Sequence, residues 1–222
     1  MIPSLNPLKP TLLLKIKALF YYTFFSDLTI ILRGQHNVYN ALSVVASLHQ
    51  AGVDINLVKP HFATFSGMGR RFQKVAEFDG ITVYDDYAHH PTEIKATLSS
   101  AEGMTGKRVI AVFQPHRYTR LKNLWTEFLG AFSNVDKIIV TDVYAASEDE
   151  IDGINSENFT RELSAHTNIP CEYISGSISD VAKSLYPNLQ ENDVVIGLGA
   201  GTITNLSKEL LAVKDEVFEI AH

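Results

Sequence analysis

The sequence predicts an α/β protein: a doubly wound, mostly parallel sheet with helices on both faces, preceded by an N-terminal hairpin or helical segment. Three observations carry this prediction. Short apolar segments alternate with amphipathic segments of helical spacing from Ile81 to the end of the chain. Polar residues gather directly after several of the apolar segments. With 222 residues, 45% of them hydrophobic, the chain can form one large domain and part of another.

The pattern of the first sixty-six residues predicts a short apolar segment followed by two helices. Apolar residues recur at helical spacing from Asn37 onward, and Gly52 stands where such a helix would end. A second helix is expected at Asn56–Phe65. The apolar run Ala18–Phe25 is far shorter than the roughly 20 residues that cross a bilayer, and no signal-peptide cleavage site follows it. We expect a strand or a helical piece there.

A hairpin introduces the main domain. Phe72–Phe78 and Ile81–Tyr84 predict two strands joined by Asp79-Gly80, a dipeptide that suits a tight hairpin turn. The elements after this hairpin alternate, which is the pattern of parallel strands with crossover helices. Helices are expected at 91–101, 121–132, 157–166, 178–185 and 205–213, and strands at 109–113, 137–143, 172–174 and 194–198.

Polar clusters follow four of these strands. They span 85–93, 114–120, 142–148 and 199–202. Ligands of doubly wound sheets bind beyond the carboxyl ends of the strands, so these clusters predict one binding edge.

Composition narrows the classes of partner and the compartment. The net charge of −6 and the pI of about 5.7 argue against a protein that grips phosphate backbones, so we expect no nucleic-acid partner. No segment has the length of a membrane span. The single cysteine, Cys171, cannot form an internal disulfide and suits a reducing cytoplasm, where we expect a buried thiol.

The segment Tyr84–Glu93 concentrates ionisable groups at a strand-to-helix turn. Two of its carboxylates and two of its imidazoles belong to residue types that bind metal ions, at Asp85, Asp86, His89 and His90. A metal-dependent hydrolase is therefore one interpretation. Adjacent side chains rarely point at one ion, however, and an aspartate can instead cap the next helix while a histidine bonds within the core. We favour no metal site.

Two arginines and a glycine turn are the other notable features. Arg117 and Arg120 are three residues apart and would share a face in a helical turn, where two guanidinium groups can hold a carboxylate or a phosphate. A solvated helix start is the alternative. Gly197–Gly201 follows a strand and suits a tight turn at the ligand edge. No Gly-x-x-x-x-Gly-Lys-Ser/Thr stretch is present to hold nucleotide phosphates.

Four motifs in register resemble the Mur ligase family of peptidoglycan synthesis. They are Gly34–Leu42, Gly67–Phe72, Asp85–Glu93 and Phe113–Arg120. The resemblance runs from about Leu28 to about Val213 and is strongest to the members that add L-alanine to UDP-N-acetylmuramate. It implies that 1–66 is a remnant of a central ATP-binding domain, with 1–27 unplaced. It implies that 67–222 is the Rossmann-like carboxy-terminal domain.

The resemblance also implies an activity. Such ligases use ATP and Mg²⁺ to phosphorylate the muramoyl carboxylate, and the amine of L-alanine then attacks the acyl phosphate. The magnesium ligands would lie mostly in domains that precede this chain, so we expect the chain to be inactive alone and to need those domains as partners. UDP-N-acetylmuramate, L-alanine and ATP are the implied small-molecule ligands.

Eleven residues match functional positions of the family. Arg71 resembles the arginine that reaches the γ-phosphate. The implied nucleotide-binding residues are Asn40, His36, Asn37, Arg70, Asp86 and Tyr87, with Asn40 at adenine and Asp86 at the ribose. The implied L-alanine site comprises His89, His116, Arg117 and Arg120.

Two other interpretations remain open. Ala88, where the alanine ligases more often have glycine, is a departure toward the ligases that recycle murein tripeptide. Arg70–Gln73 and Gln114–Arg120 instead match the alanine ligases. A binding module that kept the fold and lost catalysis is the second alternative.

Overall fold

The computed structural model describes residues 14–20, 23–32, 35–65, 67–101, 104 and 106–220. The chain divides into two compact units, Met1–Met68 and Gly69–His222, and each is described by itself. No helix in the described part of the chain is both long and apolar enough to cross a bilayer.

The first unit is a two-stranded antiparallel sheet packed with two helices. Strand β1 (Leu14–Phe20) pairs with β2 (Thr23–Ile30), and the register shifts between Ala18 and Leu19. Both described parts of the apolar run are therefore strand. Helix α1 (Gln35–Gln50) and helix α2 (Ile55–Phe62) follow. A small core holds this unit together, formed by Leu28, Ile30, Ala41, Val45 and Ile55.

Helix α2 is shorter than the periodicity predicts. Asp54 caps its first turn by accepting a hydrogen bond from the backbone N–H of Asn56 at 2.9 Å. Pro60 lies in its last turn and has no N–H to continue the ladder, and the helix ends at Phe62 instead of Phe65.

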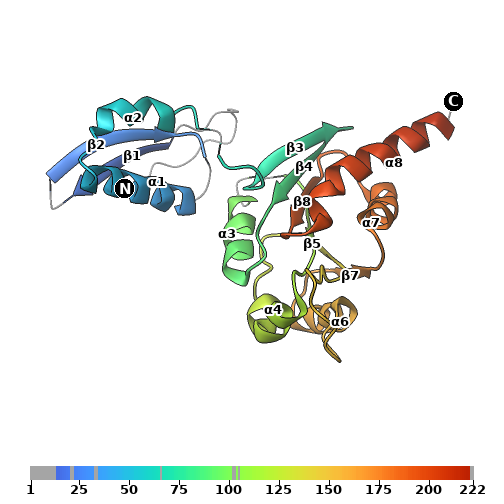
Figure 1. The fold of residues 1–222 in the computed structure, drawn as a ribbon. Coiled ribbons are helices and arrows are strands. Elements are labelled where there is room, and N and C mark those ends of the chain that lie inside the picture. The colour runs from blue at the N-terminus through green and yellow to red at the C-terminus, as the bar shows by residue number, and fades with distance from the viewer. Residues whose placement is uncertain are drawn as a thin grey trace. The chain divides into compact units, whose positions relative to one another are not determined.

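The second unit contains a six-stranded sheet in the order β3-β4-β8-β5-β6-β7 (Figure 1). Its strands are β3 (Gln73–Phe78), β4 (Ile81–Asp86), β5 (Val109–Phe113), β6 (Lys137–Thr141), β7 (Cys171–Ile174) and β8 (Val194–Leu198). Only the β3–β4 pair is antiparallel. Asp79 and Gly80 both have positive φ, at 48° and 76°, as a type I′ hairpin turn requires. The predicted doubly wound, mostly parallel sheet is confirmed.

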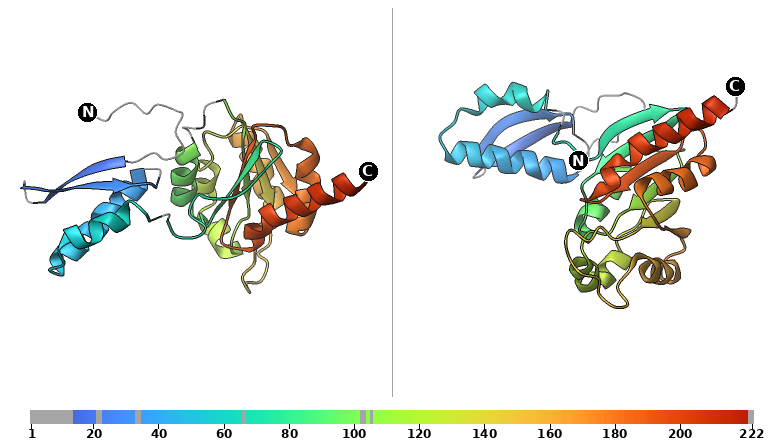
Figure 2. Two further views of the ribbon diagram at one scale, coloured as in Figure 1. Left: turned by 90° about the horizontal axis from the view of Figure 1, so that it is seen from above. Right: turned by 45° about the vertical axis from the view of Figure 1, so that its right-hand side comes forward.

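Alternating side chains of the buried strands supply both faces of this sheet. In β5, Val109, Ala111 and Phe113 belong to the core on one face, and Ile110 and Val112 to the core on the other. The first face is covered by α3 (Pro91–Ala101), α4 (Tyr118–Asn123), α5 (Trp125–Leu129) and α6 (Ser156–His166). The second is covered by α7 (Ile178–Leu185) and α8 (Leu206–Ile220), as Figure 2 also shows.

Several element boundaries differ from the sequence prediction, by one residue at some ends and by more at others. The helix expected at 121–132 is two short helices separated at Leu124, whose φ of −117° and ψ of 23° are not helical. Helix α8 extends to Ile220, beyond the predicted end at Val213, and its exposed residues 215–219 lack the buried apolar positions on which the prediction rested. Strand β6 ends at Thr141 instead of Val143, where its pairing with β7 stops.

The cysteine is less enclosed than the composition suggested. Cys171 is only partly buried at the start of β7, and its thiol donates to the carbonyl of Ile169 at 3.2 Å. Burial is nevertheless the main reason that its pKa is raised above the ordinary value.

Candidate functional site

The centre of the sheet contains a topological switch point, where the helices that follow neighbouring parallel strands pack on opposite faces. Strand β8 lies between β4 and β5, although it is the last strand in the sequence. The helix after β4 is α3 on one face, whereas the helix after β8 is α8 on the other. A crevice for ligands forms at such a switch point, outside the carboxyl ends of the strands. Three of the four predicted polar clusters begin at the ends of β4, β5 and β8.

The glycine turn after β8 is closely packed against the end of β5. A Cβ on Gly201 would come within 2.5 Å of both Gln114 Oε1 and Tyr144 Cγ. Gln114 is buried, accepts a hydrogen bond from the backbone N–H of Ile203 at 2.9 Å and donates to Thr202 Oγ1 at 2.9 Å. These contacts require a side-chain-free turn at this edge of the sheet.

Asp86 holds the turn after β4. Its side chain is buried, and its two oxygens accept hydrogen bonds from the backbone N–H groups of Phe72 at 2.6 Å and Ala88 at 2.7 Å. Burial raises the pKa of this carboxyl above its ordinary value, against the lowering effect of those N–H groups. The hydrogen bonds of Asp86 fix the turn, and its binding of a ribose stays a prediction.

Asp85 points to different partners. Arg70 donates from Nε to Asp85 Oδ2 at 2.9 Å and from Nη2 to the carbonyl of Gly199 at 2.6 Å. Thr204 Oγ1 also donates to Asp85 Oδ2 at 2.9 Å, while the other oxygen, Oδ1, is buried and has no hydrogen-bond partner in the described part of the chain. Arg70 therefore ties the β3–β4 region to the glycine turn, a structural contact beside its predicted nucleotide role.

Tyr87 presents an exposed ring beside two cations. The guanidinium carbons of Arg70 and Arg71 lie 5.0 Å and 5.8 Å from its centroid. The Arg71 side chain is 51% exposed, and its Nη1 lies 3.7 Å from Glu93 Oε1. Burial raises the pKa of Glu93, but the backbone N–H of His89 and the charges of His89 and Arg71 outweigh it, so that the pKa is lowered. The Arg71 side chain is thus half exposed, with Glu93 and the Tyr87 ring as its neighbours.

A row of aromatic rings continues from Tyr87 across the strand ends. The Tyr87 and His89 centroids lie 5.1 Å apart, those of His89 and His116 5.8 Å apart, and those of His116 and Tyr144 5.4 Å apart. The last pair is stacked, with an interplanar angle of 18°. The sequence motifs gave no reason to single out Tyr144, which belongs to the polar cluster after β6 and reaches the site only through the parallel pairing of β5 and β6.

Arg120 and Arg117 flank His116 in different ways. Arg120 lies in the first turn of α4, and its Nη1 is 2.9 Å from Nδ1 of His116. Arg117 precedes the helix with a φ of 71°, so the two arginines do not share a helical face as the spacing predicted. Its Nη1 lies 3.6 Å from Glu148 Oε1, and Glu148 also accepts hydrogen bonds from Thr119.

The pKa of His116 is lowered. Burial is the main cause, and the positive charges of Arg120, His89 and Arg117 add to it, against the opposing charge of Glu148. The ring is therefore expected to be neutral near pH 7, with Nδ1 available to accept a hydrogen bond from the Arg120 guanidinium.

Acidification is expected to destabilise the protein through His116. Because its folded pKa lies below the ordinary value of 6.5, the unfolded chain binds the proton more tightly. The stabilising contribution is present above that ordinary value and is lost as the pH falls through the folded pKa. Thermal unfolding between about pH 8 and about pH 5 should show a smaller loss for His116→Gln than for the wild type. His166→Gln, at an exposed position in α6, is the control, and equal pH profiles for the wild type and His116→Gln would contradict this assignment.

The nucleotide-binding residues predicted before Met68 belong to the first unit. Asn40 is exposed on α1, and its Nδ2 lies 3.4 Å from Oδ1 of Asn37. His36 lies in the same helix, but its side chain is outside the described part of the structure.

The four candidate metal ligands considered from the sequence do not converge. Asp85 and Asp86 bond to separate partners, as described above, and Nδ1 of His89 lies 2.9 Å from the carbonyl oxygen of Tyr87. His90 Nδ1 accepts a hydrogen bond from the N–H of Thr92 at 3.3 Å. Within the described part of the chain, no three His, Cys, Asp or Glu residues are placed to hold a metal ion.

Comparison with known proteins identifies the fold and the family. Residues 70–201 match the family described as Mur ligase, glutamate ligase domain. A UDP-N-acetylmuramate–L-alanine ligase from Caldicellulosiruptor bescii is 45% identical over 170 residues, which cover 77% of this chain and 37% of that relative. One from Rickettsia felis is 38% identical over 191 residues, covering 85% of this chain and 40% of the relative.

Solved structures of Mur ligases have the same fold as this chain. A UDP-N-acetylmuramate–alanine ligase from Thermotoga maritima superposes with a TM-score of 0.67 at 26% identity, covering 87% of this chain and 41% of that one. A murein peptide ligase from Psychrobacter arcticus shares the fold, with a TM-score of 0.60 at 21% identity over 84% of this chain and 38% of its own. The chain spans about 40% of the length of the curated relatives. Its sequence match and its doubly wound sheet show that the chain belongs to the Mur ligase family.

Proposed function

We propose that this chain is the carboxy-terminal portion of an ATP-dependent, ADP-forming ligase that adds L-alanine to UDP-N-acetylmuramate in the cytoplasm. In this proposal, 67–222 is the carboxy-terminal domain and 1–66 belongs to the central ATP-binding domain. The names of relatives that are 38% to 45% identical support the choice of substrates. The sequence of this chain contains no phosphate-binding loop, which we expect in the rest of the enzyme.

The observation that carries the proposal is the pair of guanidinium groups that flank the row of rings at the ends of β4 and β5. Arg120 and Arg117 flank His116, which in turn lies beside His89. Guanidinium groups bind carboxylates strongly, and an amino acid held by its carboxylate keeps its amine free to react. We therefore assign the L-alanine site to these four residues.

We assign the ATP-facing role to the other end of the same row. Arg71 is half exposed beside the Tyr87 ring, so it can neutralise charge on a transferring phosphoryl group while the ring packs beside the purine. Asn40, with His36 and Asn37 near it in α1, is assigned to adenine, and Asp86 and Arg70 to shaping the ribose side. The relationship to family members supports these roles.

The reaction we propose proceeds through an acyl phosphate. ATP transfers its γ-phosphoryl group to the muramoyl carboxylate, the L-alanine amine attacks the resulting carbonyl carbon, and phosphate leaves. The described residues offer no cluster for Mg²⁺. From the resemblance to the family, the magnesium site is proposed to lie in the remainder of the enzyme. This chain orients the amine and neutralises negative charge, which together account for much of such catalysis.

A fusion enzyme tests the proposal. In it, this chain replaces the matching carboxy-terminal part of the Caldicellulosiruptor bescii relative. The chain alone is expected to release no phosphate from ATP in response to L-alanine and UDP-N-acetylmuramate, whereas the fusion enzyme should do so. A correctly folded fusion enzyme that accepts murein tripeptide in preference to L-alanine would indicate the recycling ligase. One that binds L-alanine without any turnover would indicate a binding module.

A further inference from the structure

A second crevice lies at the ends of β6 and β7. The helix after β6 is α6, which packs on one face of the sheet, and the helix after β7 is α7, which packs on the other. Neighbouring parallel strands whose helices part in this way leave space beyond their carboxyl ends. A cavity of about 530 Å³ occupies this position, within the range of small-molecule sites.

The cavity is lined by acidic and neutral side chains. Three carboxylates line it, from Asp142, Glu150 and Asp152, and none of the described lining residues is Lys, Arg or His. The remaining lining residues are Tyr118, Val143, Ile151, Gly153, Ile154, Asn155, Ser156 and Tyr173. The N-terminal end of α6 favours anions, but Asn155 already caps it by accepting from the N–H of Asn158 at 2.8 Å. The net field in the cavity therefore favours a cation.

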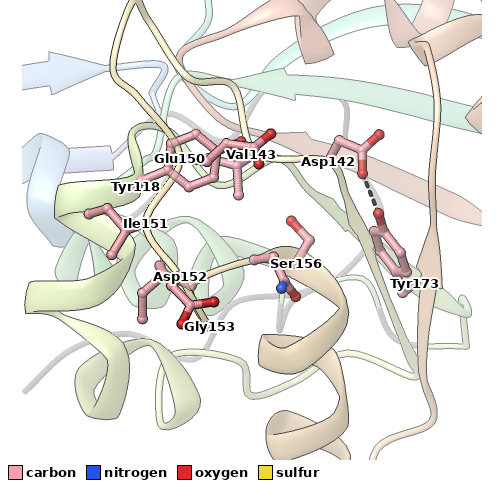
Figure 3. A pocket seen from close by; sticks show the side chains of 11 residues that line it. Tyr118, Asp142, Val143, Glu150, Ile151, Asp152, Gly153, Ser156 and Tyr173 are labelled. Atoms are coloured by element: carbon pink, nitrogen blue, oxygen red, sulfur yellow. Dashed lines mark hydrogen bonds between the residues drawn. The ribbon is translucent and has the colours of Figure 1, made fainter.

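Two tyrosines reinforce the negative field. Tyr173 donates its hydroxyl to Asp142 Oδ1 (Figure 3), and burial together with Asp142 raises the pKa of Tyr173 to about 12. The pKa of Tyr118 is also raised, by burial first and then by the charge of Glu150 and a hydrogen bond to it. Both phenols thus remain protonated and act as donors to carboxylates.

Ser156 is the observation that points to a ligand. This residue is 2% exposed, and its hydroxyl has no hydrogen-bond partner among the residues that the structure describes. Figure 3 shows the side chain directed into the space between Tyr118 and Tyr173. A buried hydroxyl without a partner is unfavourable, and a ligand in the cavity that donates a hydrogen bond to it would remove this penalty.

We propose that this cavity binds a small organic molecule through a primary ammonium group, held by Ser156, Glu150 and Asp152. The binding is independent of the ligase activity proposed above.

The geometry favours ammonium over guanidinium. Guanidinium forks suit a carboxylate with both oxygens free. Both oxygens of Asp142 are occupied, by the Tyr173 hydroxyl and by the backbone N–H of Gly176 at 2.8 Å, and Glu150 accepts from Tyr118. The proposed acceptors on Ser156, Glu150 and Asp152 come from three separate side chains, which suits a compact group with three donors better than the planar fork of one guanidinium.

Calorimetric titration of the chain with butylamine, and with butanol as its neutral counterpart, tests the proposal. Butylamine should bind and butanol should bind at least roughly 10-fold more weakly, because only the amine carries the charge. Glu150→Gln and Asp152→Asn should each weaken butylamine binding roughly 5- to 10-fold. Asp149→Asn is the matched control: the carboxylate is next to Glu150 in sequence, is exposed, and does not line the cavity.

Ser156→Ala separates a ligand role from a structural one. It should weaken butylamine binding several-fold while the melting temperature in the absence of amine stays the same or rises, because an unsatisfied hydroxyl is removed. Absence of butylamine binding, equal binding of butanol, or an equal loss in Asp149→Asn and Asp152→Asn would each overturn the proposal. So would tighter binding of butylguanidine than of butylamine.

Discussion

Replacing Arg120 by alanine in the fusion enzyme should lower kcat/KM for L-alanine roughly 10- to 100-fold, because a hydrogen bond to a charged group contributes about 1.5–3 kcal/mol. The guanidinium lies 2.9 Å from His116 Nδ1 and is proposed to hold the substrate carboxylate. Most of the loss is expected in KM for L-alanine, since the carboxylate is held before and during the reaction. KM for ATP should change little. Steady-state phosphate release at varied L-alanine concentrations measures both.

Two variants make this result specific. Lys122→Ala removes a positive charge from an exposed position of the same helix and should leave kcat/KM within roughly twofold. Arg120→Lys retains the charge but not the planar pair of donors, so it should recover only part of the activity. If Arg120→Ala kept the KM for L-alanine of the unsubstituted fusion enzyme, the amino-acid site would have to lie elsewhere.

Replacing Asp86 by alanine should destabilise the isolated chain by roughly 2–4 kcal/mol. The change leaves the buried N–H group of Ala88 and the partly buried N–H group of Phe72 without their acceptor, and each such loss costs about 1–3 kcal/mol. Urea unfolding followed by circular dichroism measures the free energy without any nucleotide. A family role in ribose binding alone would predict no such loss.

Asp149→Ala is the matched control, because that carboxylate is exposed in a loop and should change stability by less than about 0.5 kcal/mol. Asp86→Asn keeps one carbonyl oxygen as an acceptor and is expected to fall between the wild type and Asp86→Ala. Equal stability of Asp86→Ala and the wild type would show that the two N–H groups find other partners.

Much of the second unit could be predicted from local pattern. The helix at 91–101 and the strands at 109–113 and 194–198 have the predicted boundaries, because each is bounded by Pro, Gly or charged residues and has the apolar pattern of its element. The break at Leu124 was not predicted, since the apolar period continues through it to Phe132. Periodicity records which side chains are buried, and Phe132 is buried without being helical.

The sequence could name candidate members of the site but not the contacts between them. Motif order brought His89, His116 and Arg120 into one prediction, and the structure places them together. The contribution of Tyr144 depends on the pairing of β5 with β6 and on the close approach at Gly201. The shared helical face of Arg117 and Arg120 was wrong, because Arg117 adopts a positive φ before the helix begins.

By itself the sequence determined the layered fold, the hairpin and the positions of the polar clusters, because these follow from periods of two and 3.6 residues and from turn chemistry. Only the tertiary structure decided what neighbouring residues do. Asp85 and Asp86 are adjacent, but successive side chains of a strand point to opposite faces of the sheet. Asp85 therefore bonds to Arg70 and Thr204, whereas Asp86 accepts from the backbone N–H of Ala88 in the turn after β4. Only the winding of the chain decided that β8 enters between β4 and β5 and that a cavity lies beyond β6 and β7, since both depend on contacts between residues far apart in the sequence.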